Sequence, residues 1–350
     1  MEFKPKDREF IRTKEGLFFC VTGYLHPPDR YTAYLKYSPD PQGLWQSRTE
    51  LRSIQKEPIA YRREVSYYHV TNIAETIRYL EKNYPWYIHD CPVRNIRFSM
   101  VPQEYVAHYY DPQERLNEIM ANPQDSLEEE ARGLITEITT CAGISLADLG
   151  ITGSILLGLH NLTFSDINLL VYGLDKAEKV RAALRERKCD RISPLNTAII
   201  ERWNQEMLDW FPVNEAEGQY AVERRWNYGL YGDRFFGIHP TRTDQEITEQ
   251  YGQHIYRSGG PVHIRAIAAD VREAIFQPAV YRVEDVQILD GPSEAQAITQ
   301  IVSYEGRFRD MVEAGQSLEA LGKLETVDGH PQQLVVGTTQ LAGQEYIKPG

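Results

Sequence analysis

Two small groups of polar residues in the segment 150–173 have the types and spacing needed to bind phosphate and metal ions. Gly153 and Ser154 form a turn whose backbone N–H groups and hydroxyl can approach phosphate oxygens closely. After a gap of 11 residues come Asp166 and Asn168, in "DINLLVYG". They share one face of a strand, because alternate strand residues point to the same side. Two carboxylates in this arrangement hold divalent metal ions for phosphoryl transfer, and here the second is an amide.

Two strands and several helices are predicted around these groups. "LADLGITGS" and "DINLLVYG" have the short apolar runs of buried strands. The segment "SLEEEARGLITEITTCAG" has an apolar stripe, a capping box of Ser126 and Glu129, and Gly143 as its stop, which together predict a helix. Three more elements are predicted further along the chain: a helix capped by Asp175, a helix within 194–211, and a strand at 234–242.

The Gly-Ser turn and the strand that follows it resemble the signature of the DNA-polymerase-β-like nucleotidyltransferase superfamily. In that signature a Gly-Gly or Gly-Ser pair precedes a strand that reads Asp-hydrophobic-Asp/Glu-hydrophobic. The segments "TGS" and "DINL" match this pattern except at Asn168. The wording "TGSILLGLHN" and "SDINLLVYG" is also similar to archaeal and bacterial proteins known as nucleotidyltransferase-domain proteins.

The resemblance implies a small mixed sheet with helices and a role for each residue of the motif. Gly153 and Ser154 would hold the phosphates of a nucleoside triphosphate (NTP), and Asp166 and Asn168 would bind Mg²⁺. The metal ions would activate a hydroxyl of an unknown acceptor and neutralise charge on the leaving pyrophosphate. The alternative for Gly153-Ser154 is a plain turn.

A third acid on a later strand completes the metal site that the resemblance implies. Asp233, just before the strand at 234–242, is the first candidate, and His239 within that strand is the second. The alternatives are an exposed turn for Asp233 and a packed or exposed histidine. Arg224 and Arg225 are expected to contact the triphosphate, with a solvated basic face as the alternative.

Other residues near the motif have both a functional and a structural interpretation. Arg234 and Arg242 belong to the same basic group as Arg224 and Arg225, and His160 lies in the gap between the two motif segments. Stacking on a base or packing in the core are the two interpretations of four aromatic residues: Trp203, Trp210, Trp226 and Tyr228.

Asn168 leaves catalysis undecided at the level of sequence. An amide oxygen can ligate a metal ion but carries no charge, so a two-metal site would lose transition-state stabilisation. The leading hypothesis is Mg²⁺-dependent nucleotidyl transfer from an NTP. The alternative is a degenerate nucleotidyltransferase that binds a nucleotide or a partner protein without chemistry.

The fold class predicted for the 350 residues is α+β in three domains. An α+β domain is expected at 1–125, with a strand region at 58–70 and a helix from Asn72 that ends before Pro85. The nucleotidyltransferase-like core spans 126–255. Strand-rich segments separated by turns predict a small sheet or closed barrel at 256–350.

Charge limits the partners that this chain is expected to bind. The formal net charge is −12, and the segment 261–350 alone has 7 Lys and Arg against 13 Asp and Glu. A barrel that binds nucleic acid normally has a positive groove, so non-specific nucleic-acid binding is not expected. The net charge does not exclude nucleotide binding, because a metal ion and a few local groups can neutralise the charge of a nucleotide.

Cysteine spacing and hydropathy indicate the expected location. Four cysteines at 20, 91, 141 and 189 form no CxxC pair, so we expect small buried hydrophobes rather than a disulfide framework or a zinc site. The sequence has no run of 18 apolar residues, and its charged start is unlike a signal peptide. A cytoplasmic location is therefore expected, and the oligomeric state is left open.

Overall fold

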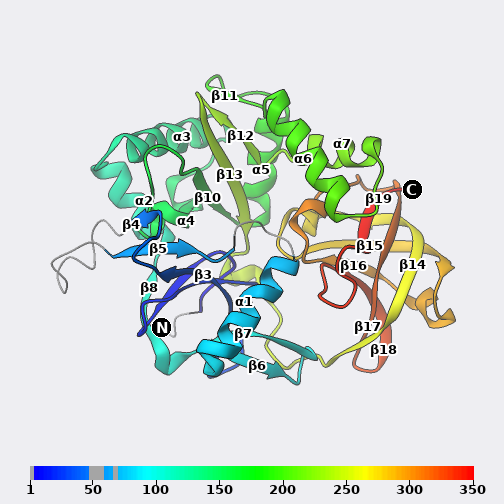
Figure 1. The fold of residues 1–350 in the computed structure, drawn as a ribbon. Helices are drawn as coiled ribbons and strands as arrows, with labels where there is room; N and C mark the ends of the chain where they lie inside the picture. The colour runs from blue at the N-terminus through cyan, green and yellow to red at the C-terminus, as the bar shows by residue number, and fades with distance from the viewer. Residues whose placement is uncertain (1–3, 47–58, 66–69) are drawn as a thin grey trace.

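Three sheets and the helices around them make up the computed structural model, which describes residues 4–46, 59–65 and 70–350. The predicted α+β class is confirmed. Each sheet belongs to a different third of the chain, and the three units surround the centre of the molecule (Figure 1). Short 3₁₀ turns connect the larger elements at Pro85–Tyr87, Gln103–Tyr105, Leu146–Asp148, Asp244–Glu246, Arg272–Ile275, Ser293–Ala297 and Gly306–Phe308.

The N-terminal domain is an antiparallel sheet covered by helix α1 (Val70–Asn83). Leu80 of α1 packs into one core cluster with Phe19, Leu35 and Val101 of the sheet. The helix ends before Pro85, as predicted, but starts two residues before Asn72. Of the strand region predicted at 58–70, residue 58 and residues 66–69 lie outside the described part. The strands are β1 (Phe10–Thr13), β2 (Phe18–Val21), β3 (Arg30–Pro39), β4 (Trp45–Gln46), β5 (Ala60–Arg63), β6 (Ile88–Cys91), β7 (Ile96–Pro102) and β8 (Val106–Tyr110).

The middle domain is a mixed sheet in the order β11-β12-β13-β10-β9. Strand β10 lies between β9, which is antiparallel to it, and β13, which is parallel to it. Every second residue of β10, namely Ile167, Leu169 and Val171, is fully buried in the core. Asn168 lies between the first two and therefore points to the opposite face of the sheet. The strands are β9 (Leu149–Thr152), β10 (Ile167–Tyr172), β11 (Ile192–Ser193), β12 (Tyr228–Tyr231) and β13 (Arg234–Thr241).

Six helices of the central segment pack against different cores. Leu116 and Ile119 of α2 pack with α3 against the middle sheet, so α2 belongs structurally with the core although it precedes residue 126. Met207 of α6 and Val222 of α7 instead pack against the C-terminal sheet, so these helices join the two units. The helices are α2 (Pro112–Ala121), α3 (Ser126–Ala142), α4 (Gly153–Leu156), α5 (Leu174–Arg185), α6 (Thr197–Trp210) and α7 (Glu215–Glu223).

Two helix caps differ by one or two residues from the prediction. Asp125, not Ser126, caps α3, because its Oδ1 accepts hydrogen bonds from the N–H groups of Leu127 and Glu128, both at 3.0 Å. Helix α5 begins at Leu174 after Gly173, so Asp175 lies within its first turn rather than at the cap. The predicted stop at Gly143 is confirmed, and this residue has the left-handed backbone that favours glycine, with φ of 62°.

The C-terminal domain is a small closed barrel with one additional strand, as the turn spacing predicted. Its strands pair in the order β14-β15-β16-β18-β17, and β17 pairs back with β14. Strand β19 pairs with the first half of β17. Tyr281, Ile301 and Leu334 face the interior and are fully buried. The strands are β14 (Tyr256–Asp270), β15 (Ala279–Asp290), β16 (Gln300–Ser303), β17 (Ser317–Val327), β18 (His330–Val336) and β19 (Tyr346–Pro349).

Buried ion pairs hold the barrel against the middle domain. Asp310, which is 1% exposed, accepts from Arg181 Nη1 at 3.0 Å and from Arg185 Nη2 at 2.8 Å. Both arginines come from α5 of the middle domain. Removal of one partner of such a buried pair leaves an uncompensated charge, so this contact fixes how the two domains meet.

A disulfide joins Cys141 at the end of α3 to Cys189 after α5. The prediction that no cysteine is paired is wrong for these two residues. Their separation of 48 positions carries no local signal, and only the packing of α3 beside α5 brings them together. Cys20 and Cys91 are free and buried, as predicted.

We predict that Cys141→Ser, Cys189→Ser and the double variant each lower the free energy of unfolding by the same amount, about 4 kcal/mol. The equality follows because each variant removes the same cross-link, which restricts the unfolded chain. Urea denaturation of the oxidised protein measures this, with the wild type in reductant as the control. A wild type whose stability is unchanged by reductant would contradict the prediction.

Candidate functional site

A cavity of about 1020 Å³ lies between the three domains. The N-terminal sheet supplies Lys36 to its wall, the middle domain supplies Asp166, and the barrel supplies Arg309. Its volume is at the upper end of the range for a site that encloses one small molecule. The Gly153-Ser154 turn and Asn168 open onto the same cavity, so the fold brings the motif to the junction of the domains.

The charge of the cavity wall is opposite to that of the whole chain. Among the described residues that line it, 11 are Arg or Lys and 8 are Asp or Glu. The chain as a whole has a formal net charge of −12. A concave positive surface in an acidic protein concentrates small anions.

The Gly-Ser turn is held in place from both sides. Gly153 has a left-handed backbone with φ of 71°, which explains why glycine occupies this position. The Ser154 hydroxyl is buried and donates to Ser165 Oγ at 3.4 Å. Thr152, just before the turn, donates its hydroxyl to the carbonyl of Arg8 at 2.6 Å. This bond ties the middle domain to the N-terminal one at the cavity.

Asn168 forms a hydrogen-bonded pair with His239. The Oδ1 atom of Asn168 lies 2.9 Å from Nε2 of His239. Gly237 is level with Asn168 in the parallel pairing of β10 and β13. A Cβ atom at Gly237 would lie 2.9 Å from Asn168 Oδ1, and 3.1 Å from both His239 and the ring of Tyr228. Glycine at 237 therefore permits these three side chains to converge.

His239 is neutral in this environment. Burial, and then the charges of Arg8, Arg309 and Arg225, lower its pKa well below the ordinary value. A neutral imidazole that faces an amide oxygen has its proton on the facing nitrogen, so Nε2 donates to Asn168. The pair therefore has no charge where the superfamily signature implies acids.

Arginines from all three domains meet next to this pair. Arg8 precedes β1, Arg225 follows α7, and Arg309 follows β16 of the barrel. Burial, and then the nearby charges of Arg307 and Arg309, reduce the pKa of Arg225 to about 10 against an opposing effect of Tyr228. Burial also lowers the pKa of Arg309, and the charge of Arg8 contributes. Asp7 and Glu305 act in the opposite direction: Asp7 Oδ2 lies 3.6 Å from Arg8 Nε, and both acids raise the pKa of Arg309. A further anion in the cavity would add to this compensation.

Tyr228 is the aromatic residue at the centre of this arginine group. The guanidinium of Arg225 lies 4.5 Å from its ring centroid and 4.2 Å from that of Trp203. Burial tends to raise the pKa of Tyr228, but Arg225, Arg309, Arg8 and Arg307 together outweigh it and lower this pKa to about 8. The phenol thus has the acidity expected beside fixed positive charge.

Asp166 lines the cavity together with a lysine of the N-terminal domain, whose pKa its charge affects. Lys36 of β3 is 3% exposed, and its pKa is lowered by burial and by Arg63, while Asp166 acts in the opposite direction. The only carboxylate of the predicted metal pair therefore has a basic neighbour among the described residues. No feature of the local sequence around Lys36 indicated this role.

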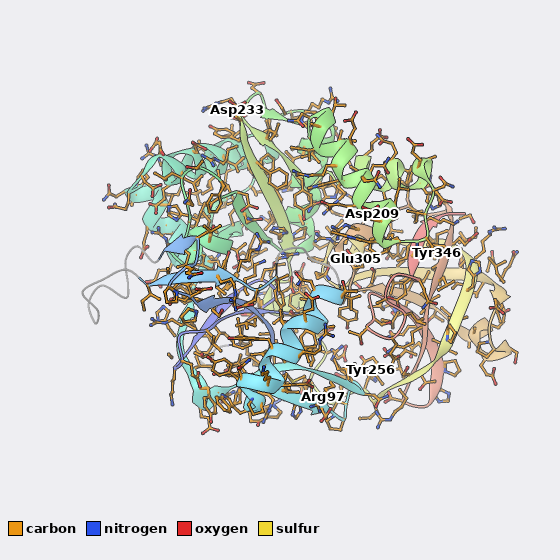
Figure 2. All side chains as sticks on the ribbon, viewed as in Figure 1. Arg97, Asp209, Asp233, Tyr256, Glu305 and Tyr346 are labelled. Carbon is orange, nitrogen blue, oxygen red and sulfur yellow. A yellow bond between two sulfur atoms is a disulfide. The ribbon has the colours of Figure 1, made fainter. Side chains whose placement is uncertain are left out.

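Asp233 does not join the site, so the prediction of Asp233 as third acid is corrected. It lies with Gly232 in the exposed turn between β12 and β13, at the upper edge of the molecule in Figure 2. Glu305, which lines the cavity, is near the centre of the same view. Alternation along β13 places His239, the second candidate, beside Asn168 instead.

Arg224 and Arg225 both follow the end of helix α7, but their side chains reach different places. Arg224 is not in the cavity wall: its Nε donates to the carbonyl of Asp310 at 2.6 Å and its Nη2 to Glu313 at 2.6 Å. The prediction of a ligand contact is therefore wrong for Arg224, which joins the middle domain to the barrel. Arg225 does line the cavity.

The remaining candidates divide between the wall and the scaffold. Arg234 donates to the carbonyls of Ser165 and Leu162, both at 3.0 Å, and so holds the loop before Asp166. Arg242 lines the cavity and donates to Glu273 at 2.7 Å. Trp203 and Tyr228 line the cavity, whereas Trp210 and Trp226 pack against the domain cores.

Asp125, Glu128 and His160 form a group of suitable metal ligands outside the cavity, with donor atoms within 4.8 Å of one another. These atoms already have protein partners. Asp125 Oδ2 lies 2.8 Å from His160 Nε2, and Glu128 bonds to Arg115 and to the backbone of Gln124. The group therefore fastens the loop that contains His160 to the start of α3.

Comparison with known proteins shows one relative of the same length. An uncharacterized protein of Methanocaldococcus jannaschii, MJ1086, is 30% identical over 355 aligned residues, which cover 99% of each chain. No family model matches the sequence. No solved structure matches it either. No helix in the described part of the chain is long and apolar enough to cross a membrane.

We predict that Gly237→Ala lowers the free energy of unfolding by about 1–3 kcal/mol, because the new methyl group would displace Asn168, His239 or Tyr228. Gly260→Ala is the matched control, since a Cβ there meets nothing within 4 Å among the described residues. Urea denaturation of both variants measures the difference. Equal stability of the two variants would show that the three side chains are not packed around Gly237.

Proposed function

We propose that this chain, which belongs to the same family as the M. jannaschii protein MJ1086, binds a nucleoside polyphosphate in the central cavity. The middle domain supplies a nucleotidyltransferase-like Gly-Ser turn, and arginines of all three domains neutralise the phosphates. The observation that carries the proposal is the meeting of Arg8, Arg225 and Arg309 beside the neutral Asn168–His239 pair.

Fixed charge in this cavity favours a ligand with several negative charges. Arg8, Arg225 and Arg309 line the same cavity as His239, and the charge of each lowers the pKa of this histidine. Guanidinium groups bind phosphate oxygens through paired, charge-assisted hydrogen bonds. A polyphosphate brings several negative charges to these arginines, whereas a single carboxylate brings only one.

The Gly-Ser turn together with the size of the cavity favours a nucleotide over a free inorganic anion. Gly153 has the left-handed conformation that exposes backbone N–H groups, and Ser154 follows it in the cavity wall. The cavity is also larger than a phosphate chain requires, at about 1020 Å³. Space therefore remains for a nucleoside beyond the phosphates.

Two Mg²⁺ ions do not fit the donor set at the motif. Asn168 Oδ1 is already an acceptor for His239, and neither residue is charged. Asp166 has Lys36 as a basic neighbour. A two-metal site needs several carboxylate oxygens around the ions. We therefore propose that arginines, rather than a pair of metal ions, neutralise most of the phosphate charge.

Mg²⁺-dependent nucleotidyl transfer is the second candidate function. The observation in its favour is that Asp166, Ser154 and the Gly153 turn line one cavity, as the superfamily signature requires. Asp166 would then hold a single Mg²⁺ ion that arrives with the NTP. Pyrophosphate release that requires Mg²⁺, and that Asp166→Ala abolishes, would establish this activity over binding alone.

A cytoplasmic location is also part of this proposal, because nucleoside polyphosphates are intracellular ligands. The Cys141–Cys189 disulfide is compatible with a cytoplasmic location in a hyperthermophile and counts against it in other organisms, because disulfides are uncommon inside their cells. Non-specific nucleic-acid binding is not proposed, given the net charge of −12.

We predict that ATP binds with similar affinity in EDTA and in Mg²⁺, and that Arg8→Met and Arg309→Met each weaken binding by at least about tenfold. The reason is that each variant removes one cation from the phosphate site. Isothermal titration calorimetry measures the affinities, after thermal melting has established that each variant is folded.

Arg272→Met serves as the matched control. Arg272 is two-thirds exposed, pairs with Asp270 and is outside the cavity wall. Its affinity for ATP is expected to equal that of the wild type. Failure of ATP, GTP, CTP and UTP to bind to the wild type would refute the proposed function. Binding that disappears in EDTA would favour the metal-dependent alternative.

We predict that ATP affinity falls as the pH rises from about 8 to 10. Bound phosphates offset the arginine charges and so raise the pKa of Tyr228 from about 8 toward the ordinary value of 10. The complex therefore keeps a proton that the free protein loses, and affinity falls by up to about tenfold per pH unit for one proton. Titration calorimetry at several pH values measures this slope.

The groups that face Tyr228 are Arg225, Arg307, Arg309, Arg8 and the neutral His239. Lys36 elsewhere in the cavity responds in the same direction, because a bound anion also raises its lowered pKa. Tyr228→Phe is therefore expected to reduce the slope by one proton rather than to abolish it. Tyr105→Phe, outside the cavity, is the control. An unchanged slope in Tyr228→Phe would exclude this residue as the source.

A further inference from the structure

The barrel wall that faces the cavity has two parallel rows of side chains that cross its strands. The first, the amide row, consists of Arg282, Gln300, Gln333 and Glu325, which are partners in the pairings β15–β16, β16–β18 and β17–β18. The second, the valine row, consists of Val280, Val302 and Val335, which are partners in the same pairings. All seven residues line the cavity. Strand alternation places the two rows on the same face, about 7 Å apart.

Hydrogen bonds run along the amide row in one direction. Arg282 Nη1 donates to Gln300 Oε1. Gln300 Nε2 donates to Gln333 Oε1 at 2.5 Å, and Gln333 Nε2 donates to Glu325 Oε2 at 2.6 Å. Each bond fixes the orientation of the next amide. The row is therefore ordered before any ligand enters.

Gln300 keeps binding capacity beyond these bonds. Its carbonyl oxygen has two lone pairs and its amide nitrogen has two N–H groups, and the described residues use one of each. The side chain is only partly buried, so it is open to the cavity. One remaining acceptor and one remaining donor on a planar amide match the N6 amino group and N7 of adenine.

Along β16, the amide row is followed first by the valine row and then by arginines. Gln300 is followed on the same face by Val302, and the chain then reaches Arg307 and Arg309 after the strand ends at Ser303. Gln300 lies about 10 Å before that end at the usual strand rise. A polar edge, an apolar surface and a basic group therefore follow one another in the order of a nucleotide's base edge, base face and phosphates.

We propose that the amide row is the base-recognition subsite of the cavity and that Gln300 selects adenine. The inference rests on the proposed function and deepens it, because it names the nucleoside that accompanies the phosphates. The purine lies with one face on Val280 and Val302, and its Hoogsteen edge bonds to Gln300. Gln333 and Glu325 act as positioning residues that hold the Gln300 amide.

The test compares ATP with 7-deaza-ATP, which lacks only the N7 acceptor, by titration calorimetry. In the wild type the analogue is expected to bind at least about tenfold more weakly. In Gln300→Leu the two ligands are expected to bind within about twofold of each other. Comparison of the two ligands within each variant removes any general effect of the substitution on folding. Gln287→Leu, an exposed glutamine of β15 outside the cavity wall, should keep the wild-type difference.

Equal binding of the two ligands by the wild type would overturn the subsite, as would a difference that persists in Gln300→Leu. The proposed function has a separate readout, which is binding of inorganic tripolyphosphate to the wild type. If tripolyphosphate and ATP both fail to bind, saturation-transfer NMR with adenosine tests the amide row alone. If adenosine contacts the wild type and Gln300→Leu abolishes that contact, the subsite is supported. If adenosine does not contact the wild type, the subsite is overturned.

Discussion

Repulsion among buried cations is the constraint on which the centre of this protein depends. Arg8, Arg225 and Arg309 come from three different domains, and their charges act on the same small region. Like charges close together in a partly desolvated space are unfavourable unless an anion or strong packing compensates. The buried carboxylate of Asp7, 3.6 Å from Arg8 Nε, supplies part of this compensation. The domain contacts therefore have to hold the arginines in place, and a polyanionic ligand would stabilise the closed arrangement of all three domains.

Contacts at the domain boundaries provide this support. Asp310 of the barrel pairs with Arg181 and Arg185 of α5, and Thr152 bonds to the backbone of Arg8. Helices α6 and α7 extend the barrel core toward the middle sheet. The cavity is thus lined by strands, helix ends and loops of all three domains, and these contacts hold the domains together around it.

The Asn168–His239 pair changes what the nucleotidyltransferase-like motif can do. Strand β10 and the parallel strand β13 still place two polar residues beside the Gly-Ser turn. Both are neutral, and they bond to each other rather than present a ring of oxygens. Positive charge in this cavity comes from arginine and lysine side chains, which is why we propose recognition of phosphates rather than activation of two metal ions.

The sequence by itself determined the local parts of this protein. Apolar periodicity, the stop at Gly143 and the strand-turn spacing indicated the α+β class and the barrel. The "TGS" and "DINL" segments were predicted to lie together, and both line the central cavity. These signals act between residues that are close in the chain. The cap of α3 moved by one residue, because Asp125 and Ser126 are neighbouring polar side chains that can both accept from the first N–H groups. Helix α5 begins after Gly173 without a side-chain cap, so Asp175 has no capping role.

Only the tertiary structure decided which distant residues meet. Arg8, Lys36 and Arg309 reach the cavity from other domains, and no local pattern around them indicates a site. Asp233 and Arg224 looked equivalent to His239 and Arg225 in the chain. Asp233, however, lies in the exposed turn before β13 begins, and Arg224 bonds to the barrel instead of lining the cavity. The Cys141–Cys189 disulfide likewise depends on helix packing. Long-range pairing follows from how whole elements bury their apolar faces, and a short stretch of sequence does not contain that information.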